Sequence, residues 1–484
     1  MIPLHEMKKN PFFGVILKLA ELNRRKVYLV GGYLRDLFLK RKSFDFDFAV
    51  DKGAIKFSRS IAERLKGDFV VLDKEHGSAR VIVKKENTSY TLDFTDFRGR
   101  DINEDLSLRD FTINAMALDL SCLKNAASEE FIDPYSGKSD IKKGLIKVIN
   151  NRAFCDDPLR ILRVFSLSAV LKFKIDGETL KLAQENKDGI FSVSSERIRE
   201  ELFKILAVPN AADFFKKMDS LSILEKIIPE VNIMRDIQQG PYHHLDVLEH
   251  SFEAMSQIEK LFSELKRNKK VSVYLDEIIA AEHSRRQVLK LAVFLHDIGK
   301  PDAITFEEGK TKFHGHEHIG RRLASAVCDR LKLSGKEKDA IKAMILWHLR
   351  PGYLADNPDI SERAIFRYFR DTDSEGVSIL LLSMADQRST RGPLTVKASR
   401  IRHEKTCLWL IKEYFRRKEE KKLPKIITGD DLMEKLKLVP GPVFGKILDK
   451  VEEEQAAGEI TTKKEALELA RQIAAGHVKK IVKT

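Results

Sequence analysis

The sequence of 484 residues contains few cysteines, and its four are scattered. Cys122, Cys155, Cys328 and Cys407 form no Cys-x-x-Cys pair, which argues against a disulfide framework and against a thiolate zinc site. No stretch approaches the roughly 18 continuous apolar residues of a membrane span, and residues 1–10 lack the apolar core of a signal peptide. These absences predict a cytoplasmic protein with reduced thiols and no membrane contact.

The overall composition is that of a folded chain with an excess of positive charge. Hydrophobic residues make up 43% and charged residues 33%, which excludes disorder over most of the length. Lys and Arg number 86 against 73 Asp and Glu, a net charge of +13. Such an excess indicates an anionic partner, most commonly nucleic acid, although many basic proteins simply carry solvated lysines.

The hydrophobic pattern divides the chain into a mixed head and a helical body. Short apolar and alternating runs predict strands near 27–30, 44–50, 69–71, 79–83 and 90–94, with a helix over 55–65 between them. After Asp156 the periodicity is helical to the end. We therefore expect an α/β head over 1–150 followed by an all-α body, divided into a neck (151–240), a third domain (241–400) and a tail (401–484).

Asp45 and Asp47 are the first candidate catalytic residues. Alternation in a strand places them on one face, opposite Phe44, Phe46 and Phe48. Two neighbouring carboxylates repel each other unless a cation lies between them, and divalent ions at such a pair can promote phosphoryl transfer. An isolated Asp-x-Asp is more often a solvated acidic face, so its surroundings decide the interpretation.

A glycine turn precedes this strand. Gly31-Gly32 follows the strand at 27–30 and begins a helical run that carries Arg35 and Asp36. Bare backbone N–H groups at the start of a helix are suited to bind phosphate. The strand, the turn and the Asp-x-Asp strand together indicate a nucleotide site far more strongly than any one of them.

The motifs together resemble the class II tRNA nucleotidyltransferases and bacterial poly(A) polymerases, whose head is similar to DNA polymerase beta. The first motif is matched by residues 29–36 with Asp45-Phe46-Asp47, and a hinge motif by Phe131-Ile132-Asp133-Pro134. The second, usually Arg-Arg-Asp, is matched by Leu108-Arg109-Asp110 and continues to Asn114, with Leu108 in place of its first Arg.

The resemblance implies roles for these head residues. Asp45 and Asp47 would hold Mg²⁺, Gly31, Gly32 and Arg35 would bind the triphosphate, and Arg109 and Asp110 would bind phosphate and ribose. Asp36 and Asn114 would also belong to the nucleotide-binding site. Asp93, on the strand at 90–94, would be a third catalytic carboxylate. The alternative for Asp93 is an ion pair with Arg98 or Arg100.

A further motif would choose the nucleotide. Asp156-Asp157-Pro158-Leu159-Arg160 and Arg163 resembles the family's base-reading helix. Its spacing predicts one helical face carrying Asp156, Asp157 and Arg160, whose acceptors and donors match the Watson–Crick edge of C or A. Standing alone, the motif would more often be a surface ion-pair ladder.

A second set of residues resembles the HD phosphohydrolase superfamily. His296-Asp297 ends an apolar helix at 288–295, and Gly315-His316-Glu317 matches the family better than His314 or His318. The implied metal ligands are His250, His296, Asp297, His316, His348 and Asp386. This N/O set suits Mg²⁺, Mn²⁺, Ni²⁺ or Co²⁺, and the implied activity is hydrolysis of phosphoesters at RNA ends. A degenerate fold kept for packing or tRNA binding is the alternative.

We therefore expect a template-independent enzyme that adds C and A to the 3′ end of tRNA from CTP and ATP. A CC-adding enzyme, an A-adding enzyme and a poly(A) polymerase remain alternatives within the same class. Two other classes stay open: an active HD phosphohydrolase with a non-catalytic RNA-binding head, and an RNA chaperone without metal dependence. The oligomeric state is not predicted.

Overall fold

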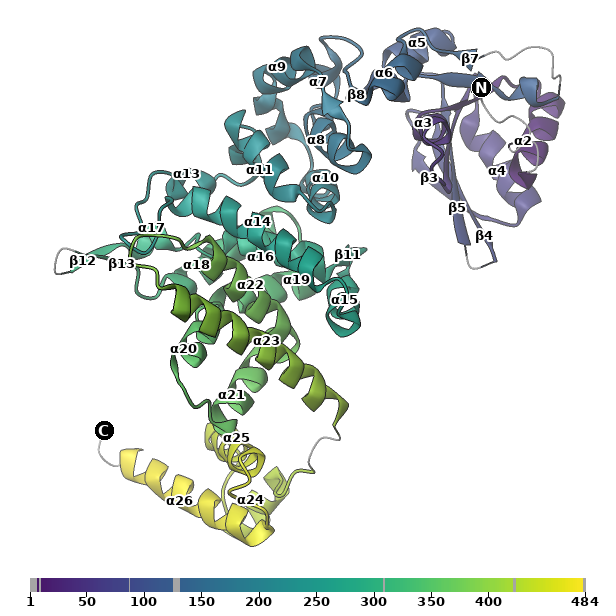
Figure 1. The fold of residues 1–484 in the computed structure, drawn as a ribbon. Helices are drawn as coiled ribbons and strands as arrows, with labels where there is room; N and C mark the ends of the chain where they lie inside the picture. Colours follow the sequence, from purple (N-terminus) through teal and green to yellow (C-terminus); the bar gives the residue numbers. More distant parts are fainter. Residues whose placement is uncertain are drawn as a thin grey trace. The chain divides into compact units, whose positions relative to one another are not determined.

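The computed structural model describes residues 7, 10–86, 88–124, 131–307, 310–420 and 424–481 (Figure 1). The chain forms two compact units. The first comprises Met1–Val208 and Met218–Ile227, and the second comprises Pro209–Lys217 and Ile228–Thr484. Among the described residues, no helix has the length and the apolar character needed to cross a membrane.

A seven-stranded mixed sheet forms the head of the first unit, in the order β3-β4-β5-β2-β1-β6-β7. Its strands are β1 (Val27–Val30), β2 (Asp45–Val50), β3 (Asp68–Asp73), β4 (Ser78–Lys85), β5 (Thr88–Asp96), β6 (Ala117–Asp119) and β7 (Phe131–Ile132). β2 and β5 are parallel, whereas the other neighbours are antiparallel. The mixed sheet confirms the predicted α/β head.

Alternation along β2 divides the sheet into an apolar and an acidic face. Phe46 and Phe48 are 2% and 1% exposed, and Phe48 stacks on Phe94 at 4.7 Å between ring centroids. Phe13 of α2 packs edge-on against both β2 rings. The strand begins one residue later than predicted, because Phe44 directly precedes β2 and is 44% exposed.

Short helices surround the sheet and lead into a helical neck. The head contains α2 (Pro11–Leu22), α3 (Gly32–Phe38), α4 (Ala54–Leu65), α5 (Ile102–Ser107), η1 (Thr112–Asn114), η2 (Leu120–Leu123) and α6 (Gly137–Lys143). The neck contains β8 (Leu145–Ile146), α7 (Ala153–Asp156), α8 (Leu159–Leu171), β9 (Lys174–Ile175), α9 (Gly177–Glu185), η3 (Lys187–Ser192), α10 (Ser195–Ala207), α11 (Ala211–Ser220) and α12 (Leu224–Ile227).

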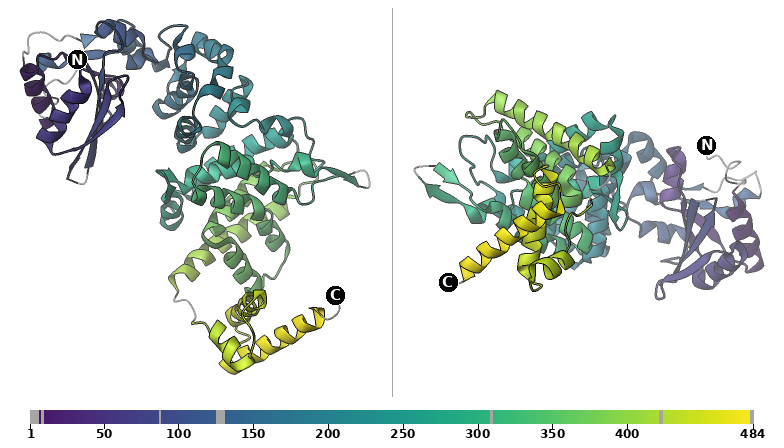
Figure 2. Two further views of the ribbon diagram at one scale, coloured as in Figure 1. Left: turned by 180° about the vertical axis from the view of Figure 1, so that it is seen from behind. Right: turned by 90° about the horizontal axis from the view of Figure 1, so that it is seen from below.

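The second unit is almost entirely helical (Figure 2). Its helices are α13 (Val231–Met234), α14 (Val247–Leu265), α15 (Lys269–Asp276), α16 (Arg285–Leu295), α17 (Lys300–Ala303), α18 (His316–Arg330), α19 (Gly335–Trp347), α20 (Arg350–Asp356), α21 (Glu362–Thr372), η4 (Asp373–Glu375), α22 (Gly376–Ser389) and α23 (Lys397–Glu419). Two small hairpins that the helical pattern did not predict pair β10 (Ile278–Ala280) with β11 (His283–Ser284) and β12 (Thr305–Glu307) with β13 (Lys310–Lys312). The helical body is otherwise confirmed.

The end of the chain builds a small core of its own. It contains α24 (Gly429–Leu436), α25 (Pro442–Ala456) and α26 (Lys463–Ile481), which bury Leu432, Ile447 and Val451 against one another. Arg367 of α21 donates to Glu453 of α25 from both Nε and Nη2, the former over 2.7 Å. This ion pair joins α25 to the helices that precede it.

Candidate active site and metal centre

Register across the sheet brings the candidate carboxylates together. Asp47 on β2 pairs with Asp93 on β5 and with Val30 on β1, so it lies beside Asp93 and below the glycine turn. Asp45 begins β2 and is exposed. Burial raises the pKa of Asp47; Arg109 opposes this shift, and Asp93 and Asp45 add to it. A bound cation would remove this repulsion, so the residues fit a metal site.

Asp93 has a partner that the sequence did not reveal. Both of its oxygens accept hydrogen bonds of 2.8 Å, from Nε and Nη2 of Arg80 on β4. The two residues are directly opposite in the β4–β5 register. The predicted alternative partners, Arg98 and Arg100, are therefore wrong, and Arg100 donates instead to Glu104 at 3.1 Å.

The glycine turn is shaped by its contact with Asp47. Gly31 has a φ of 72°, and a Cβ at this position would lie 2.8 Å from Oδ2 of Asp47. The N–H of Gly32, the first residue of α3, is hydrogen-bonded to Asp47. Arg35 donates from Nε to Asp36 at 3.0 Å and from Nη1 to Asn114 at 2.9 Å. The side chain of Arg35 is thus engaged within the head rather than free beside the turn.

The residues of the second motif, Arg109, Asp110 and Asn114, form part of a buried polar network. Arg109 donates to Oδ2 of the buried Asp105 from Nε at 3.1 Å and from Nη2 at 3.0 Å. Asp110 accepts from Asn114 at 3.0 Å and from Nη2 of Arg163 at 2.7 Å. Burial alone would raise the pKa of Asp110, but Arg163 and these hydrogen bonds hold it at about 2. Asp110 is therefore a carboxylate at neutral pH.

One cavity of about 190 Å³ collects most of the predicted head residues. Its walls include the glycine turn, two of the three carboxylates and the second motif, namely Gly31, Gly32, Asp47, Asp93, Arg109, Asp110, Asn114 and Arg163. Cations and carboxylates thus face the same space, as a metal-bound triphosphate requires.

The predicted helical face of the base-reading motif is wrong in its geometry. Asp156 ends α7, Asp157 has extended backbone, and Pro158 is the N-cap of α8, so the acids precede the helix that carries Arg160. Arg160 is 6% exposed, and its Nη2 donates to the carbonyl of Leu108 at 2.7 Å.

The three motif residues nevertheless line one cleft. This cleft measures about 910 Å³ and is bordered by Asp156, Asp157, Arg160, Leu108 and Arg98. Arg197 of α10 donates to Asp157 at 2.9 Å and so fixes the acid at the rim. Leu108, in place of the family Arg, contributes an apolar wall and its carbonyl. The residues are brought together by a helix break rather than by helical spacing.

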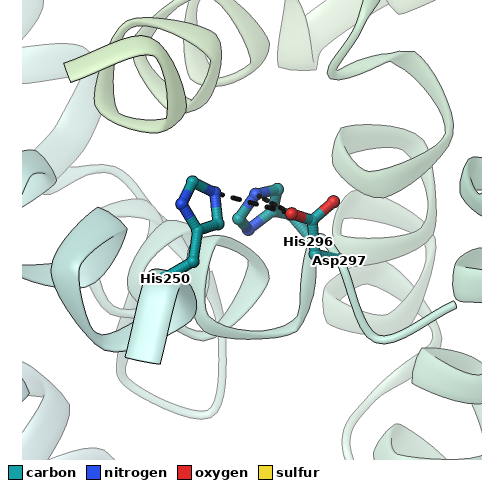
Figure 3. A group of neighbouring side chains, drawn as sticks. All are labelled: His250, His296 and Asp297. Atoms are coloured by element: carbon teal, nitrogen blue, oxygen red, sulfur yellow. Dashed lines mark ion pairs between the residues drawn. The ribbon is translucent and has the colours of Figure 1, made fainter. Parts of the chain in front are cut away.

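The second unit assembles all six predicted metal ligands. They come from α14, the end of α16, the start of α18, the end of α19 and α22. Nε2 of His250 lies 3.5 Å from Asp297, and Nε2 of His296 lies 3.2 Å from Asp297 (Figure 3). Nε2 of His250 also lies 3.0 Å from Asp386. On the other side of Asp297, Nε2 of His316 is 3.4 Å from Oδ1 and Nε2 of His348 is 3.9 Å from it.

Backbone carbonyls orient three of the imidazole rings through Nδ1. Nδ1 of His296, His316 and His348 lies 2.7, 2.8 and 2.7 Å from the backbone carbonyls of Val293, Phe313 and Ile345, respectively. Carbonyl partners fix the proton on Nδ1 and leave Nε2 as a lone-pair donor. Within the described part of the chain, Nε2 of His296 is buried without a hydrogen-bond partner. This convergence of imidazole nitrogens and carboxylates fits a divalent metal.

Asp297 lies between two groups of ligands. One group joins its Oδ2 to His250 and His296, and the other joins its Oδ1 to His316 and His348. Burial lowers the pKa of His348 to about 3, and the neighbouring imidazoles act in the same direction. A carboxylate with both oxygens facing ligand sets is suited to bridge two ions.

Sequence reasoning missed two residues beside this centre. Lys300 donates from Nζ to Oδ2 of Asp297 and to Gln239, each at 2.6 Å. The ring of His243 lies 4.8 Å from that of His250, and Nδ1 of His243 is buried with no hydrogen-bond partner among the residues that the structure describes. The signals available were the lysine three residues after Asp297 and the histidine pair that precedes α14. By contrast, His314 and His318 are exposed.

Comparisons with known proteins match successive parts of the chain. Four family models cover most of the chain: the poly A polymerase head domain (27–147), the RNA and SrmB-binding site of polymerase A (172–234), the HD domain (247–386) and tRNA nucleotidyltransferase domain 2 (398–470). The chain belongs to the tRNA nucleotidyltransferase and poly(A) polymerase family. It is an enzyme of the nucleotidyltransferase class that carries an HD domain, and both of these domain families are metal-dependent.

Curated relatives match over nearly the whole length. A CC-adding tRNA nucleotidyltransferase of Geobacter sulfurreducens is 29% identical over 94% of each chain. An A-adding tRNA nucleotidyltransferase of Deinococcus radiodurans is 28% identical over 90% of this chain and 93% of its own. The Thermotoga maritima CCA-adding enzyme complexed with tRNA has the same fold, with a TM-score of 0.63, 22% identity and coverage of 98% and 97%.

Proposed function

We propose that this chain transfers CMP and AMP from CTP and ATP to the 3′ end of tRNA and so builds or repairs the CCA end. The observation that carries the proposal is the single cavity in which Asp47 and Asp93 face the glycine turn and Arg109. Transfer would be assigned to residues 1–150, nucleotide and RNA binding to 151–240, the HD centre to 241–400, and tRNA contact to 401–484. The implied location is the cytoplasm.

The 3′-hydroxyl of tRNA would attack the α-phosphate of CTP or ATP, and pyrophosphate would leave. Asp45 and Asp47 would hold Mg²⁺, which would supply activation of the hydroxyl and neutralisation of the phosphate charge. The buried Asp47 is kept in place by the N–H of Gly32. Asp93 would join the metal ligands only after its oxygens leave Arg80. Arg109, oriented by Asp105, presents its guanidinium to the triphosphate, whose oxygens it can bind in pairs.

Nucleotide choice is assigned to the cleft beside this cavity. Asp157 at the rim can accept from the exocyclic amine of C or A, and Arg160 can donate to the ring nitrogen and carbonyl. For this role Arg160 must exchange its bond to the Leu108 carbonyl for one to the base. Arg163 keeps Asp110 ionised and in place at the border of the cavity.

The decisive experiment combines incorporation with two substitutions in the full chain. Wild-type protein should incorporate labelled CMP and AMP into tRNA only with a divalent ion, and Asp47→Asn should abolish incorporation. Glu104→Gln, which changes a surface ion pair in the same unit, is the control and should leave the rate within about twofold. Incorporation that persists in Asp47→Asn would contradict the assignment.

A partial activity is the second candidate, because the two full-length relatives named above are a CC-adding and an A-adding enzyme. In that case the chain would add only CC or only the terminal A, and another enzyme would complete the end. The same cavity and cleft would serve either activity. The number of nucleotides added to defined tRNA ends therefore distinguishes a full CCA-adding enzyme from a partial one.

We also propose that the HD centre binds Mg²⁺, Mn²⁺, Ni²⁺ or Co²⁺ and hydrolyses phosphoesters at RNA ends. His250, His296 and Asp386 would hold one ion, His316 and His348 a second, with Asp297 between them. Lys300 would bind a substrate phosphate from its place beside Asp297. Release of phosphate or opening of a 2′,3′-cyclic phosphate by wild type, and not by Asp297→Ala, tests this activity separately from nucleotidyl transfer.

A further inference from the structure

One arginine borders both spaces of the proposed nucleotide site. The cavity of about 190 Å³ carries the glycine turn and two carboxylates, and the cleft of about 910 Å³ carries the base-reading residues. Arg98 is the one described residue that lines both of them. It lies two residues beyond the end of β5, the strand that carries Asp93. Arg98 therefore marks the junction between the cavity and the cleft.

The backbone of Arg98 is held by the same carboxylate that orients Arg109. The N–H of Arg98 donates to Oδ1 of Asp105 at 3.2 Å, and Oδ2 of Asp105 accepts from Nη2 of Arg109 at 3.0 Å. One residue earlier, the N–H of Phe97 donates to the carbonyl of Val50 at 2.8 Å, at the end of β2. These bonds fix Arg98 beside the ends of the two parallel strands that carry the candidate metal ligands.

The guanidinium of Arg98 carries a charge that the protein does not neutralise. Arg80 and Arg109 are each paired with a carboxylate. Within the described ranges, the side chain of Arg98 has no carboxylate at ion-pair distance and makes no hydrogen bond, and the residue is exposed. Burial lowers the pKa of Arg160, and the positive charge of Arg98 acts in the same direction. A cation without a protein partner is thus available at the junction to an anionic ligand.

A bound nucleotide identifies the group that would lie at this junction. Its triphosphate would occupy the cavity and its base the cleft, so its ribose and α-phosphate would connect the two spaces. A ribose hydroxyl is neutral, whereas the α-phosphate is anionic, and a guanidinium forms its strongest hydrogen bonds with phosphate oxygens. The α-phosphate is also the group at which nucleotidyl transfer occurs.

We propose that Arg98 is a catalytic residue that donates to a non-bridging oxygen of the α-phosphate. The inference rests on the proposed function, because it takes CTP and ATP as the substrates. In this step the 3′-oxygen of tRNA forms a bond to the α-phosphorus, and the bond from that phosphorus to the α–β bridging oxygen breaks. Pyrophosphate leaves with the electron pair of the broken bond, and the hydroxyl proton passes to solvent. Arg98 stabilises the negative charge on the non-bridging oxygens in the transition state.

The test compares two arginines of the same loop in the full chain. Arg98→Ala removes the cation at the junction. Arg100→Ala removes an equal charge from an exposed residue that pairs with Glu104 and lines neither space. Both variants should unfold at the wild-type denaturant concentration, because neither substitution changes a buried contact.

The expected result is a large loss of rate in one variant only. Removal of one donor to a developing oxyanion lowers kcat by roughly 100- to 1,000-fold. Because Arg98 is exposed, we expect the smaller loss, a single-turnover rate at saturating CTP about 100-fold below wild type. Arg100→Ala should stay within about twofold of wild type. Arg98→Lys, which keeps the charge but loses the paired donors, should have an intermediate rate.

Sulfur substitution in the nucleotide provides a measurement that a purely structural role would not change. CTPαS carries sulfur in place of one non-bridging α-oxygen, and sulfur is the weaker hydrogen-bond acceptor. Wild-type protein should use the diastereomer whose sulfur lies toward Arg98 more slowly than CTP. Arg98→Ala should reduce this ratio of rates about tenfold, because the contact that sulfur weakens is already lost, and Arg100→Ala should keep the wild-type ratio.

Two results would overturn the inference and leave the proposed function standing. The first is equal rates in Arg98→Ala and Arg100→Ala. The second is a slow Arg98→Ala variant with the wild-type ratio for both diastereomers of CTPαS, which excludes contact with the α-phosphate. If the preference for CTP over 2′-deoxy-CTP falls at the same time, Arg98 binds the ribose instead. Failure of the wild-type protein to incorporate any nucleotide would contradict the proposed function itself.

Discussion

Replacing Gly31 with alanine tests whether the glycine turn sets the position of Asp47. With a φ of 72° and a ψ of −144°, Gly31 has a conformation that is essentially restricted to glycine, so an L residue at this position costs on the order of 1–3 kcal/mol. Its Cβ would also lie 2.8 Å from Oδ2 of Asp47, so the carboxylate must move. Since misplacement of a reacting group by about 1 Å lowers a rate by about 100-fold, we expect Gly31→Ala to reduce the single-turnover rate by about that factor.

Gly53 offers a control at which φ is also positive, but its ψ of 33° gives a left-handed helical conformation that is milder for an L residue. Its φ is 69°, and a Cβ there would lie 3.4 Å from Nη2 of Arg25, the end of a flexible side chain. Gly53→Ala should therefore lose roughly 1–2 kcal/mol of stability, no more than Gly31→Ala, measured by denaturant unfolding, and keep its rate. Equal rates in both variants, or equal losses in both, would refute the link between the turn and Asp47.

The remaining predictions concern the two centres and the buried acid. Asp110→Asn should make the free energy of unfolding less dependent on pH in acid. With a folded pKa of about 2 against 3.8 unfolded, the ionised Asp110 contributes about 2 kcal/mol of stability above pH 4, and that contribution disappears as the pH falls towards 2. Denaturant midpoints between pH 5 and pH 3 measure this, and equal slopes in both proteins would contradict it. Asp93→Asn should lower the incorporation rate less than Asp47→Asn, because Arg80 already neutralises Asp93; equal losses would show that Asp93 is a metal ligand of equal weight. His316→Ala should reduce the metal content of the HD centre by about half and Asp297→Ala by more, measured by elemental analysis, and a full complement in either would exclude the bridging role of Asp297.

Much of the head could be predicted because local patterns determine it. The alternation of Asp45-Phe46-Asp47 identifies the strand and its two faces, and an Asp-x-Asp strand after a glycine turn indicates phosphate chemistry. The pairing of Asp93 with Arg80 could not be predicted, because it depends on the register of β4 against β5. Register is determined by the whole sheet and its connecting turns, so it cannot be predicted from the sequence of either strand alone.

In the helical regions, too, the motifs could be predicted from the sequence but the contacts between distant segments could not. Ligands such as His296-Asp297 were readable because they resemble a motif, but their convergence depends on the packing of five helices. The base-reading segment was predicted as one helix, yet Pro158 begins α8 and leaves Asp157 extended before it. Arg160 points inward because α8 is buried on nearly every side, a fact of tertiary packing that spacing along one helix does not contain.

The most direct test of the account is extension of three tRNA transcripts, ending before CCA, after the first C and after CC, with CTP, ATP or both and Mg²⁺. We predict growth of each transcript to CCA followed by arrest. Arrest after CC, or extension only of the CC-ended transcript by A, would identify the partial enzyme, and long A tracts would identify a poly(A) polymerase. Failure to incorporate any nucleotide would contradict the nucleotidyltransferase account itself.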